Sequence, residues 1–494
     1  MTKPKPSRVS SKRSATQVGG ARARRAQRPR RAEVRWDTSL EGNQAFWRKV
    51  SPPQMFVGSF LLLITLGTLG LKFLPGLRTA EALSFTDSLF MTTSAVCVTG
   101  LSVSDLATEF SLGGQVFMLV LVQLGGLGML AFTSLLIQVL GFRLSLGAES
   151  LTYEAQRGAP TVNVRHLTRD VVLYTFMIEV IGAIALMIAW GPRDGIDQAW
   201  WPSVFHAVSA FCNAGFSTHS DSLMGFQSSP MTIMIVSALI IAGGISFVTM
   251  EELWLSLRTR KRTRPHRLSL HSRLVLCVTA ILLIVPWPMF AAFEWYGTLN
   301  EMSLVDKFFN SMFLSVTPRT AGFNTIDYAA ASDSTNFLTI LLMTVGGSPG
   351  STAGGMKTTT FALVVLMAWS RIRGHETTLF ANRSIPSDTI QRAIGLMVVA
   401  VSLMAIAVFA LAITDEVAGQ RGHFLTRMFE AVSAFNTVGL SMNLTPELSY
   451  CGRLVTIVLM FVGRVGPLML ASALVIRQGH RGHFRYAYED VAIG

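Results

Sequence analysis

Four short segments, each ending in a glycine, recur along the chain and carry the residues best suited to chemistry. They are Val98-Thr99-Gly100, Asn213-Ala214-Gly215, Thr320-Ala321-Gly322 and Thr437-Val438-Gly439. Successive glycines are 115, 107 and 117 residues apart, which indicates one unit of roughly 110 residues used four times. Glycine adopts backbone angles that a Cβ opposes, so an extended strand at each segment can turn its carbonyl oxygens toward a common axis. Rings of carbonyl oxygens replace the hydration shell of a potassium ion, and the four glycine segments therefore predict a selectivity filter formed by one chain.

A second aligned feature follows each glycine segment. Residues 126, 244, 347 and 464 lie 25–29 residues after the four glycines, in Leu124-Gly125-Gly126, Ala242-Gly243-Gly244, Val345-Gly346-Gly347 and Val462-Gly463-Arg464. Small residues in membrane helices are typical of sites where backbones approach closely. The fourth unit instead places Arg464 inside an apolar run, where a charge is expensive and is a functional candidate by default.

The third unit continues with a glycine-rich loop that cannot be a regular helix in lipid. Its residues are Gly346, Gly347, Ser348, Pro349, Gly350, Ser351, Thr352, Ala353, Gly354, Gly355 and, after Met356, Lys357. Non-helical backbone at membrane depth survives only where it is buried in protein or lines water. We therefore expect the helix in this unit to be broken over 346–360, around a loop that faces a cavity.

The same loop approaches the phosphate-binding pattern G-x-x-x-x-G-K-[ST] between Gly350 and Thr358. Met356 adds one residue between Gly355 and Lys357 and so breaks the spacing. A true phosphate-binding loop also follows a buried strand of an α/β domain, whereas this loop interrupts an apolar run. We do not expect it to bind a nucleotide.

The elements that position these residues are those of a polytopic membrane protein. Hydrophobic residues make up 50% of the chain and charged residues 14%, and the mean hydropathy is +0.45, which is too apolar for a soluble chain of 494 residues. A helix needs about 20 mostly apolar residues to cross the hydrocarbon core. Eight runs meet this requirement, two in each unit, near residues 55–74, 115–141, 171–190, 231–257, 274–296, 337–369, 393–413 and 454–476.

Four shorter semi-apolar stretches precede the glycine segments, at Thr86–Val96, Pro202–Cys212, Leu304–Val316 and Thr426–Phe435. They are too short to span a bilayer at about 1.5 Å of rise per residue, so we expect re-entrant helices whose negative dipole ends favour a central cation. The predicted fold is an all-α polytopic membrane protein with four helix–pore loop–helix repeats around one pseudo-fourfold pore and eight transmembrane helices. The repeats cover residues 51–145, 165–260, 270–374 and 388–478.

The charge distribution predicts how the loops face the membrane. The net charge is +13, and Lys and Arg are dense in 1–49, 143–169, 258–273, 371–392 and 477–485. The positive-inside rule makes these segments cytoplasmic, so both termini, including 479–494, are expected inside. Residues 1–50 are expected to be a disordered basic tail against anionic membrane lipid. No aromatic residue precedes Trp36, and we expect no nucleic acid there.

The remaining ionisable residues are less informative. The four cysteines have no spacing typical of a disulfide framework or zinc site, and we expect buried thiols. Asp and Glu are scattered over the loops, whereas a membrane enzyme such as a glycosyl transferase needs clustered carboxylates or a metal set. Glu179 is nearly alone within a span. It fits an ion path and a helix-packing partner equally well.

Three stretches of the sequence resemble those of one superfamily of potassium transporters, which comprises the Trk, Ktr and plant HKT proteins. They are Asn213-Ala-Gly-Phe-Ser217, Arg319-Thr-Ala-Gly-Phe-Asn324 and the loop 346–360. The resemblance covers nearly the whole chain from about residue 50, and eight spans are more similar to the Ktr membrane subunits than to the longer Trk ones. It implies that the four glycines line a K+ filter, and that the loop after Gly346 is a gate held partly by Arg464.

The resemblance also implies a function. This is K+ uptake across the plasma (bacterial inner) membrane, through a gated pore driven by the electrochemical gradient, with dependence on Na+ left open. In related plant proteins a serine at the position of Gly100 goes with sodium transport, so Gly100 favours potassium; a sodium-permeable or sodium-selective transporter is the alternative, and a membrane enzyme is favoured least. The family further implies a homodimer on a ring of cytoplasmic nucleotide-binding regulatory subunits, through which alone a nucleotide would act.

Overall fold

The structure is a computed structural model that describes residues 52–79, 81, 83–139, 164–259, 268–417 and 423–474. The predictions for the basic tail 1–50 and for the C-terminal segment 479–494 lie outside these residues. Helix dominates the described part of the chain, as the apolar runs predict.

The helices can be grouped, in chain order, by the four predicted units. The first unit holds α1 (Pro52–Phe73), α2 (Phe85–Val96), α3 (Leu106–Glu109) and α4 (Leu112–Val139). The second holds α6 (Val164–Asp194), α7 (Ile196–Cys212), η1 (Met224–Phe226), α8 (Pro230–Gly244) and α9 (Phe247–Thr259). The third holds α10 (Leu270–Ile284), α11 (Pro286–Glu294), α12 (Leu304–Val316), α13 (Asp333–Met343) and α14 (Thr358–Ile372). The fourth holds α15 (Ser387–Val417), α16 (Phe424–Phe435), η2 (Thr445–Glu447), α17 (Tyr450–Val465) and α18 (Pro467–Leu474).

Helices long and apolar enough to cross a membrane account for part of the eight predicted spans. Four helical stretches qualify alone among the described residues: Pro53–Phe73, Arg169–Asp194, Leu270–Glu294 and Ser387–Thr414. Two bent pairs bring the number to six, because α8 with α9 and α17 with α18 pass the test together. The shorter apolar helices Leu112–Gly128 and Thr358–Ile372 lie where two further spans are predicted.

Two of the predicted runs are bent rather than continuous. Helix α9 turns by 105° from α8, and α18 turns by 92° from α17. The second bend lies at Gly466, whose φ of +86° is left-handed and is followed by Pro467. At the first bend, the carbonyl oxygens of Gly243 and Gly244 accept hydrogen bonds from a distant loop, so tertiary contacts end the helix there.

A small β-hairpin joins α14 to α15, where the sequence predicts no strand. Strands β1 (Thr378–Phe380) and β2 (Arg383–Ile385) pair antiparallel, with Phe380 opposite Arg383. The turn residues Ala381 and Asn382 both have left-handed φ, as two-residue hairpin turns require. Ala381 is not a typical residue for such a turn, so the sequence of the turn predicts the hairpin only weakly.

Four short helices, α2, α7, α12 and α16, occupy the four short stretches that the sequence predicts. Ser84 and Ser303 cap α2 and α12 by accepting hydrogen bonds from the backbone of Asp87 and Asp306. Helix α7 begins at Ile196, earlier than predicted, and includes Pro202. At most one residue separates the ends of α2, α7 and α16 from their glycine segments, and three residues separate the end of α12 from Thr320, so the helix ends position all four segments.

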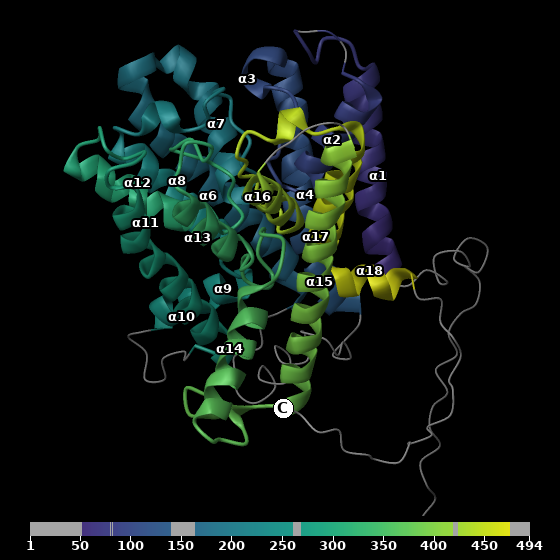
Figure 1. The fold of residues 1–494 in the computed structure, drawn as a ribbon, viewed down its shortest axis with the longest axis vertical. Coiled ribbons are helices and arrows are strands. Elements are labelled where there is room, and N and C mark those ends of the chain that lie inside the picture. Colours follow the sequence, from purple (N-terminus) through teal and green to yellow (C-terminus); the bar gives the residue numbers. More distant parts are fainter. Residues whose placement is uncertain are drawn as a thin grey trace, which may run out of the picture. The chain divides into compact units, whose positions relative to one another are not determined.

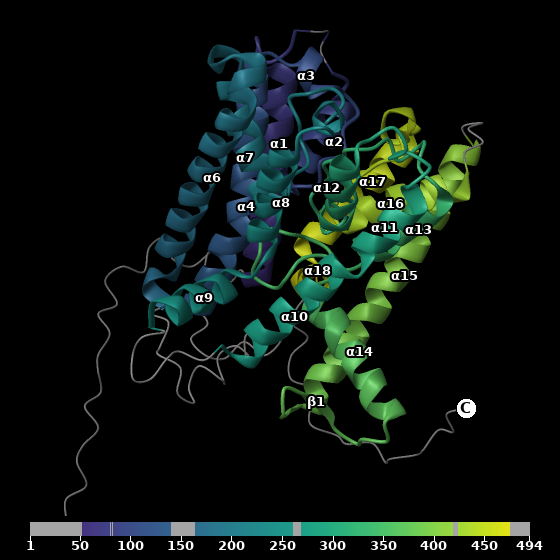
Figure 2. The ribbon, with the colours of Figure 1, turned by 90° about the vertical axis from the view of Figure 1, so that its left-hand side faces the viewer.

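The packing of the short helices closes into a circle. Each lies against a helix of the preceding unit: α7 against α4, α12 against α8, α16 against α13, and α2 of the first unit against α17 of the last. Side chains along these short helices are largely buried, including Phe90, Phe211, Phe313 and Phe435. Figures 1 and 2 show α3 near one end of residues 51–494 and α14 near the other.

Candidate functional site

The four glycines lie around one ring. A Cβ built on any of them would collide with the backbone of the next glycine segment, which places the four segments side by side in chain order. The nearest carbonyl oxygens to such a Cβ are Ala214 O for Gly100 (2.4 Å), Ala321 O for Gly215 (2.9 Å), Val438 O for Gly322 (2.6 Å) and Thr99 O for Gly439 (2.1 Å). The last contact closes the ring from the fourth unit to the first, so no side chain larger than hydrogen fits at these positions.

The backbone of all four segments has the same unusual conformation. The glycines have φ of +96°, +70°, +81° and +92°, and the residue two before each glycine is also left-handed: Val98, Asn213, Thr320 and Thr437. The residue between them has negative φ in each case. Left-handed φ on a non-glycine residue costs on the order of 1–3 kcal/mol and is typical of functional sites. Because the sign of φ alternates along each segment, successive carbonyl oxygens point to one side of the strand instead of to opposite sides.

Hydrogen bonds from the short helices hold the glycine segments. The backbone N–H groups of Thr99, Ala214 and Val438 donate to the carbonyl oxygens of Ser94, Ser209 and Ser433 at 2.7–2.8 Å. The hydroxyl groups of Ser94 and Ser433 also accept from the N–H groups of Gly100 and Gly439, each at 3.1 Å. These serines are not among the predicted site residues, although two of them, Ser209 and Ser433, lie in the stretches 205–211 and 429–435, whose sequences differ at one position only.

The first glycine of each aligned pair lets a long helix approach a short one. A Cβ on Gly125, Gly243 or Gly463 would lie within 2.0 Å of the carbonyl oxygen of the last or next-to-last residue of α2, α7 or α16. The expected close approach of backbones is therefore present in these three units. In the third unit, a Cβ on Gly346 would instead meet Gly354 O at 2.6 Å, within the glycine-rich loop.

The glycine-rich loop lies between α13 and α14 and contacts the second and fourth units. On one side, the N–H groups of Ser348 and Thr352 donate to the carbonyl oxygens of Gly244 and Gly243 at 3.1 and 3.2 Å. On the other, Met356 N donates to Asn436 Oδ1 at 3.3 Å. The loop also lies against the glycine segments.

The loop approaches the fourth glycine segment closely. A Cβ built on Gly354 would lie 2.1 Å from Thr437 Oγ1, so this position has room for glycine alone. Asn213 of the second segment lies 3.2 Å from Thr352 Oγ1. The loop is therefore in direct contact with the first residues of two glycine segments, Asn213 and Thr437.

Arg464 contacts the loop, as the family resemblance implies. Its Nη1 donates to the carbonyl oxygen of Thr352, and its Nη2 donates to the carbonyl oxygen of Gly125 at 2.8 Å. The side chain is 2% exposed. Lys357, in the loop itself, donates from Nζ to Ala353 O at 2.7 Å. Two cationic side chains therefore bind backbone oxygens next to the glycine segments.

The residues three before each glycine are Cys97, Cys212, Arg319 and Asn436, and all four are buried. Cys212 Sγ lies 3.4 Å from Gln123 Oε1, and Gln123 Nε2 donates to Glu179 Oε2 at 3.1 Å. The structure thus joins Glu179 to a buried polar cluster behind the second glycine segment. The expectation that all four cysteines are buried is wrong for Cys277 and Cys451, which lie on exposed faces of α10 and α17.

Comparison with known proteins identifies the family. The model of the TrkH family, described as cation transport proteins, matches residues 52–480. The chain belongs to the TrkH family of cation transport proteins. The predicted resemblance to the Trk and Ktr transporters is therefore confirmed, and a membrane protein of cation transport follows from it. The family is one of transporters, which argues against the membrane-enzyme interpretation.

Curated relatives of this TrkH-family chain cover nearly all of it. The potassium/sodium uptake protein NtpJ of Enterococcus hirae is 37% identical over 452 residues, which are 90% of this chain and 98% of that protein. The Ktr system potassium uptake protein B of Bacillus subtilis is 36% identical over 450 residues, which cover 91% and 98%. The crystal structure of the potassium transporter TrkH from Vibrio parahaemolyticus has a TM-score of 0.69, with 19% identity and 86% of each chain covered. That likeness supports the shared fold.

Proposed function

We propose that the chain takes up potassium ions through a filter formed by the four glycine segments. The filter residues are Val98, Thr99, Gly100, Asn213, Ala214, Gly215, Thr320, Ala321, Gly322, Thr437, Val438 and Gly439. One observation carries the proposal: the four glycines close into a ring in which each lies against the backbone of the next. Carbonyl oxygens held around such a ring can replace the hydration shell of K+. The names of the two curated relatives, which include potassium uptake, support the same ion.

The same proposal includes the membrane arrangement. Four helix–pore loop–helix repeats, within residues 51–145, 165–260, 270–374 and 388–478, surround one pore with eight spans. The short apolar helices and the two bent pairs supply the spans that the four long helices do not. The basic segments face the cytoplasm of the plasma membrane by the positive-inside rule. A potential of 100 mV, negative inside, favours entry of one positive charge by about 2.3 kcal/mol and needs no enzymatic step.

We also propose that the glycine-rich loop is a gate. The gate residues are Gly346, Gly347, Ser348, Pro349, Gly350, Ser351, Thr352, Ala353, Gly354, Gly355, Lys357 and Arg464. Two features support a gate closed in this conformation: the loop lies against Thr437 and Asn213, and Arg464 and Lys357 place positive charge near the ring. A cation leaving the filter would meet both the loop and that charge. Opening requires the loop to move away from the glycine segments.

A second candidate is a transporter that also passes sodium, or prefers it. One observation favours it: the relative from Enterococcus hirae is named a potassium/sodium uptake protein. Gly100 has no side chain that would narrow or add a hydroxyl to the ring, and this favours potassium. The two candidates differ in the measured K+/Na+ selectivity.

The proposal also includes the subunits with which the chain assembles. We propose a homodimer in the membrane lipid, resting on a ring of cytoplasmic nucleotide-binding regulatory subunits. The relatives named as proteins of a Ktr system support a transporter with more than one component. A nucleotide would then act through those subunits and not through the glycine-rich loop.

Growth at limiting potassium tests the uptake function. The full chain is expressed, with and without a candidate regulatory subunit, in bacteria that lack their own potassium uptake systems. We expect growth at micromolar potassium, and loss of that growth when Gly439 is replaced by alanine, because the added Cβ would lie 2.1 Å from Thr99 O. Equal growth of the empty vector and the full chain would contradict the proposal.

A further inference from the structure

Three hydrogen bonds outside the glycine segments share one spacing. Each joins a side chain of a short helix to a hydroxyl group 11 residues later: Ser102 Oγ with Met91 Sδ at 3.4 Å, Ser217 Oγ with His206 Nε2 at 2.9 Å, and Ser441 Oγ with Glu430 Oε2 at 2.8 Å. The helix residue lies nine positions before the glycine of its unit, and the serine lies two positions after it. The three pairs therefore bridge the same two points in three units.

Each pair connects the two ends of a glycine segment. The short helix leads into the segment, and the serine begins the chain that leaves it. A side-chain bond between these two points restrains the C-terminal end of the glycine segment, which we call its outer end. The backbone bonds from the short helix hold the N-terminal, or inner, end. His206 and Glu430 are fully buried, whereas Ser217 and Ser441 are half-buried, so water can approach these bonds only from the serine side.

The third unit differs from the other three. Phe313 and Asn324 occupy the two positions, and the buried Phe313 ring has no polar atom to offer. The Asn324 amide instead donates to Ile326 O at 3.0 Å, and the Asn324 backbone N–H donates to Ser222 Oγ at 3.3 Å. The outer end of this strand is thus held by the loop of the second unit.

We propose that Met91, His206 and Glu430 are positioning residues which, through Ser102, Ser217 and Ser441, hold the outer end of the filter and set its ion selectivity. The inference rests on the filter proposed above. A ring of carbonyl oxygens discriminates between K+ and Na+ only while the strands keep their positions, and freeing one strand lets the ring adapt to the smaller ion.

The three pairs differ in strength. Glu430 accepts hydrogen bonds from Thr445 as well as from Ser441, and bonds to a carboxylate are roughly twice as strong as neutral ones. His206 Nδ1 lies 2.8 Å from Pro202 O, which can only accept, so in the neutral imidazole Nδ1 carries the proton and Nε2 accepts from Ser217. A thioether is a weak acceptor, which makes the Met91 pair the weakest. The glycine segment of the fourth unit is therefore the one that its own short helix restrains most strongly.

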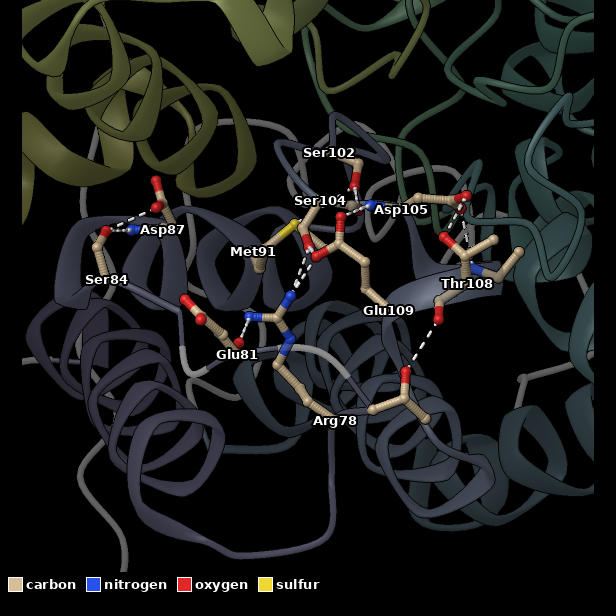
Figure 3. A network of polar contacts seen from close by, with 12 residues as sticks. Arg78, Glu81, Ser84, Asp87, Met91, Ser102, Ser104, Asp105, Thr108 and Glu109 are labelled. Atoms are coloured by element: carbon tan, nitrogen blue, oxygen red, sulfur yellow. Dashed lines mark hydrogen bonds and ion pairs between the residues drawn. The ribbon is translucent and has the colours of Figure 1, made fainter.

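A separate network supports the weak pair of the first unit, as Figure 3 shows. The one hydroxyl hydrogen of Ser102 is shared between Met91 Sδ and Ser104 O, which both only accept, and this sharing weakens the Met91 contact further. Ser104 Oγ bonds to Glu109, which forms an ion pair with Arg78. The chain that leaves the first glycine segment is thus held from the loop side. Because this network remains when the weak Met91 contact is lost, the test is made in the second and fourth units, where Ser217 and Ser441 each also accept one bond from a loop N–H, of His219 and Leu444.

The experiment measures K+ and Na+ uptake of purified full-length protein in liposomes. The variants are Ser441→Ala and Ser217→Ala, which remove the hydroxyl, and Ser441→Thr, which keeps it. Asn324→Ala is the matched control, because its position is equivalent but its amide does not reach the short helix. We expect Ser441→Ala to lower the K+/Na+ selectivity about tenfold, as losing a hydrogen bond to a charged group predicts. Ser217→Ala should lower it less, while Ser441→Thr and Asn324→Ala should keep the wild-type value.

The outcomes separate this inference from the function on which it rests. If wild-type protein takes up neither ion, the filter proposal itself fails. If wild-type protein is selective and both serine-to-alanine variants keep its selectivity, or lose only the yield of folded protein, the positioning role is overturned. Should Ser441→Ala not fold, Ser217→Ala in the second unit gives the same decision.

Discussion

Arg464, in the last turn of α17, donates a hydrogen bond from Nη1 to the carbonyl oxygen of Thr352, in the loop between α13 and α14. Its Nη2 donates to Gly125 O of α4 at 2.8 Å. One buried side chain of the fourth unit therefore binds the third unit and the first. A guanidinium is suited to this task because its planar fork carries several donors in fixed directions. In the proposed mechanism this fork keeps the gate closed.

Replacing Arg464 with alanine should raise K+ flux. The hydrogen bond that it donates to Thr352 O in the loop comes from a charged group and is worth about 1.5–3 kcal/mol, so its loss frees the loop and we expect a flux increase of about tenfold or more. Arg464→Lys keeps the charge but not the fork and should give an intermediate flux. Arg371→Ala, at the exposed end of α14, is the control and should change nothing. Wild-type flux in Arg464→Ala would contradict the closed-gate account.

Shortening the glycine-rich loop tests the gate in another way. A deletion within 348–358 removes backbone that lies against the second and fourth units. We expect higher K+ flux with the K+/Na+ selectivity unchanged, because the four glycine segments stay in place. If the shortened protein elutes as a single folded species but shows unchanged or abolished flux, the result argues against a gate.

The substitution Gly100→Ser tests the filter. An added Cβ at this position would lie 2.4 Å from Ala214 O, and the φ of +96° disfavours any side chain. We expect a lower K+/Na+ selectivity, measured by competition between the two ions during uptake. Gly395→Ala is a suitable control, because a Cβ there would meet no atom within 4 Å. A Gly100→Ser protein with wild-type selectivity would remove Gly100 from the filter.

His219 predicts a dependence of stability on pH. It lies in the loop after the second glycine segment, and its ring stacks on that of His206 with centroids 5.0 Å apart. Burial lowers the pKa of the His219 imidazole below its ordinary value of 6.5. The unfolded chain then binds more protons than the folded one as pH falls below about 6.5, so this residue's contribution to stability is present at higher pH and is lost in acid.

The measurement is the thermal unfolding midpoint in detergent between about pH 8 and pH 5. We expect His219→Gln to reduce the fall of the midpoint on acidification, because glutamine does not titrate. Groups that do not face His219 contribute equally to both proteins and cancel in the difference. Parallel curves for the two proteins would show that His219 has no such role.

The local sequence predicts the short helices and the left-handed glycines because both depend on nearby residues. The bend between α8 and α9 was not predicted, since the run 231–257 is mostly apolar throughout and the Gly243 and Gly244 carbonyls bond to a loop more than 100 residues away. The bond from Arg464 to Gly125 is likewise invisible before the fold brings α17 to α4. By contrast, residues 205–211 and 429–435 differ only in the exchange of His206 for Glu430, and this difference marks in the sequence two of the residues that bond to Ser217 and Ser441.

Anomalous diffraction tests the central claim most directly. Crystals of the wild-type protein are grown in a K+ salt and then exchanged into Rb+ or Tl+, which replace K+ and scatter anomalously. The account predicts an anomalous peak on the axis between Gly100, Gly215, Gly322 and Gly439, and its loss when the same crystals are exchanged into Na+. Well-ordered glycine segments with no peak between them, in a protein that takes up K+ in liposomes, would contradict it.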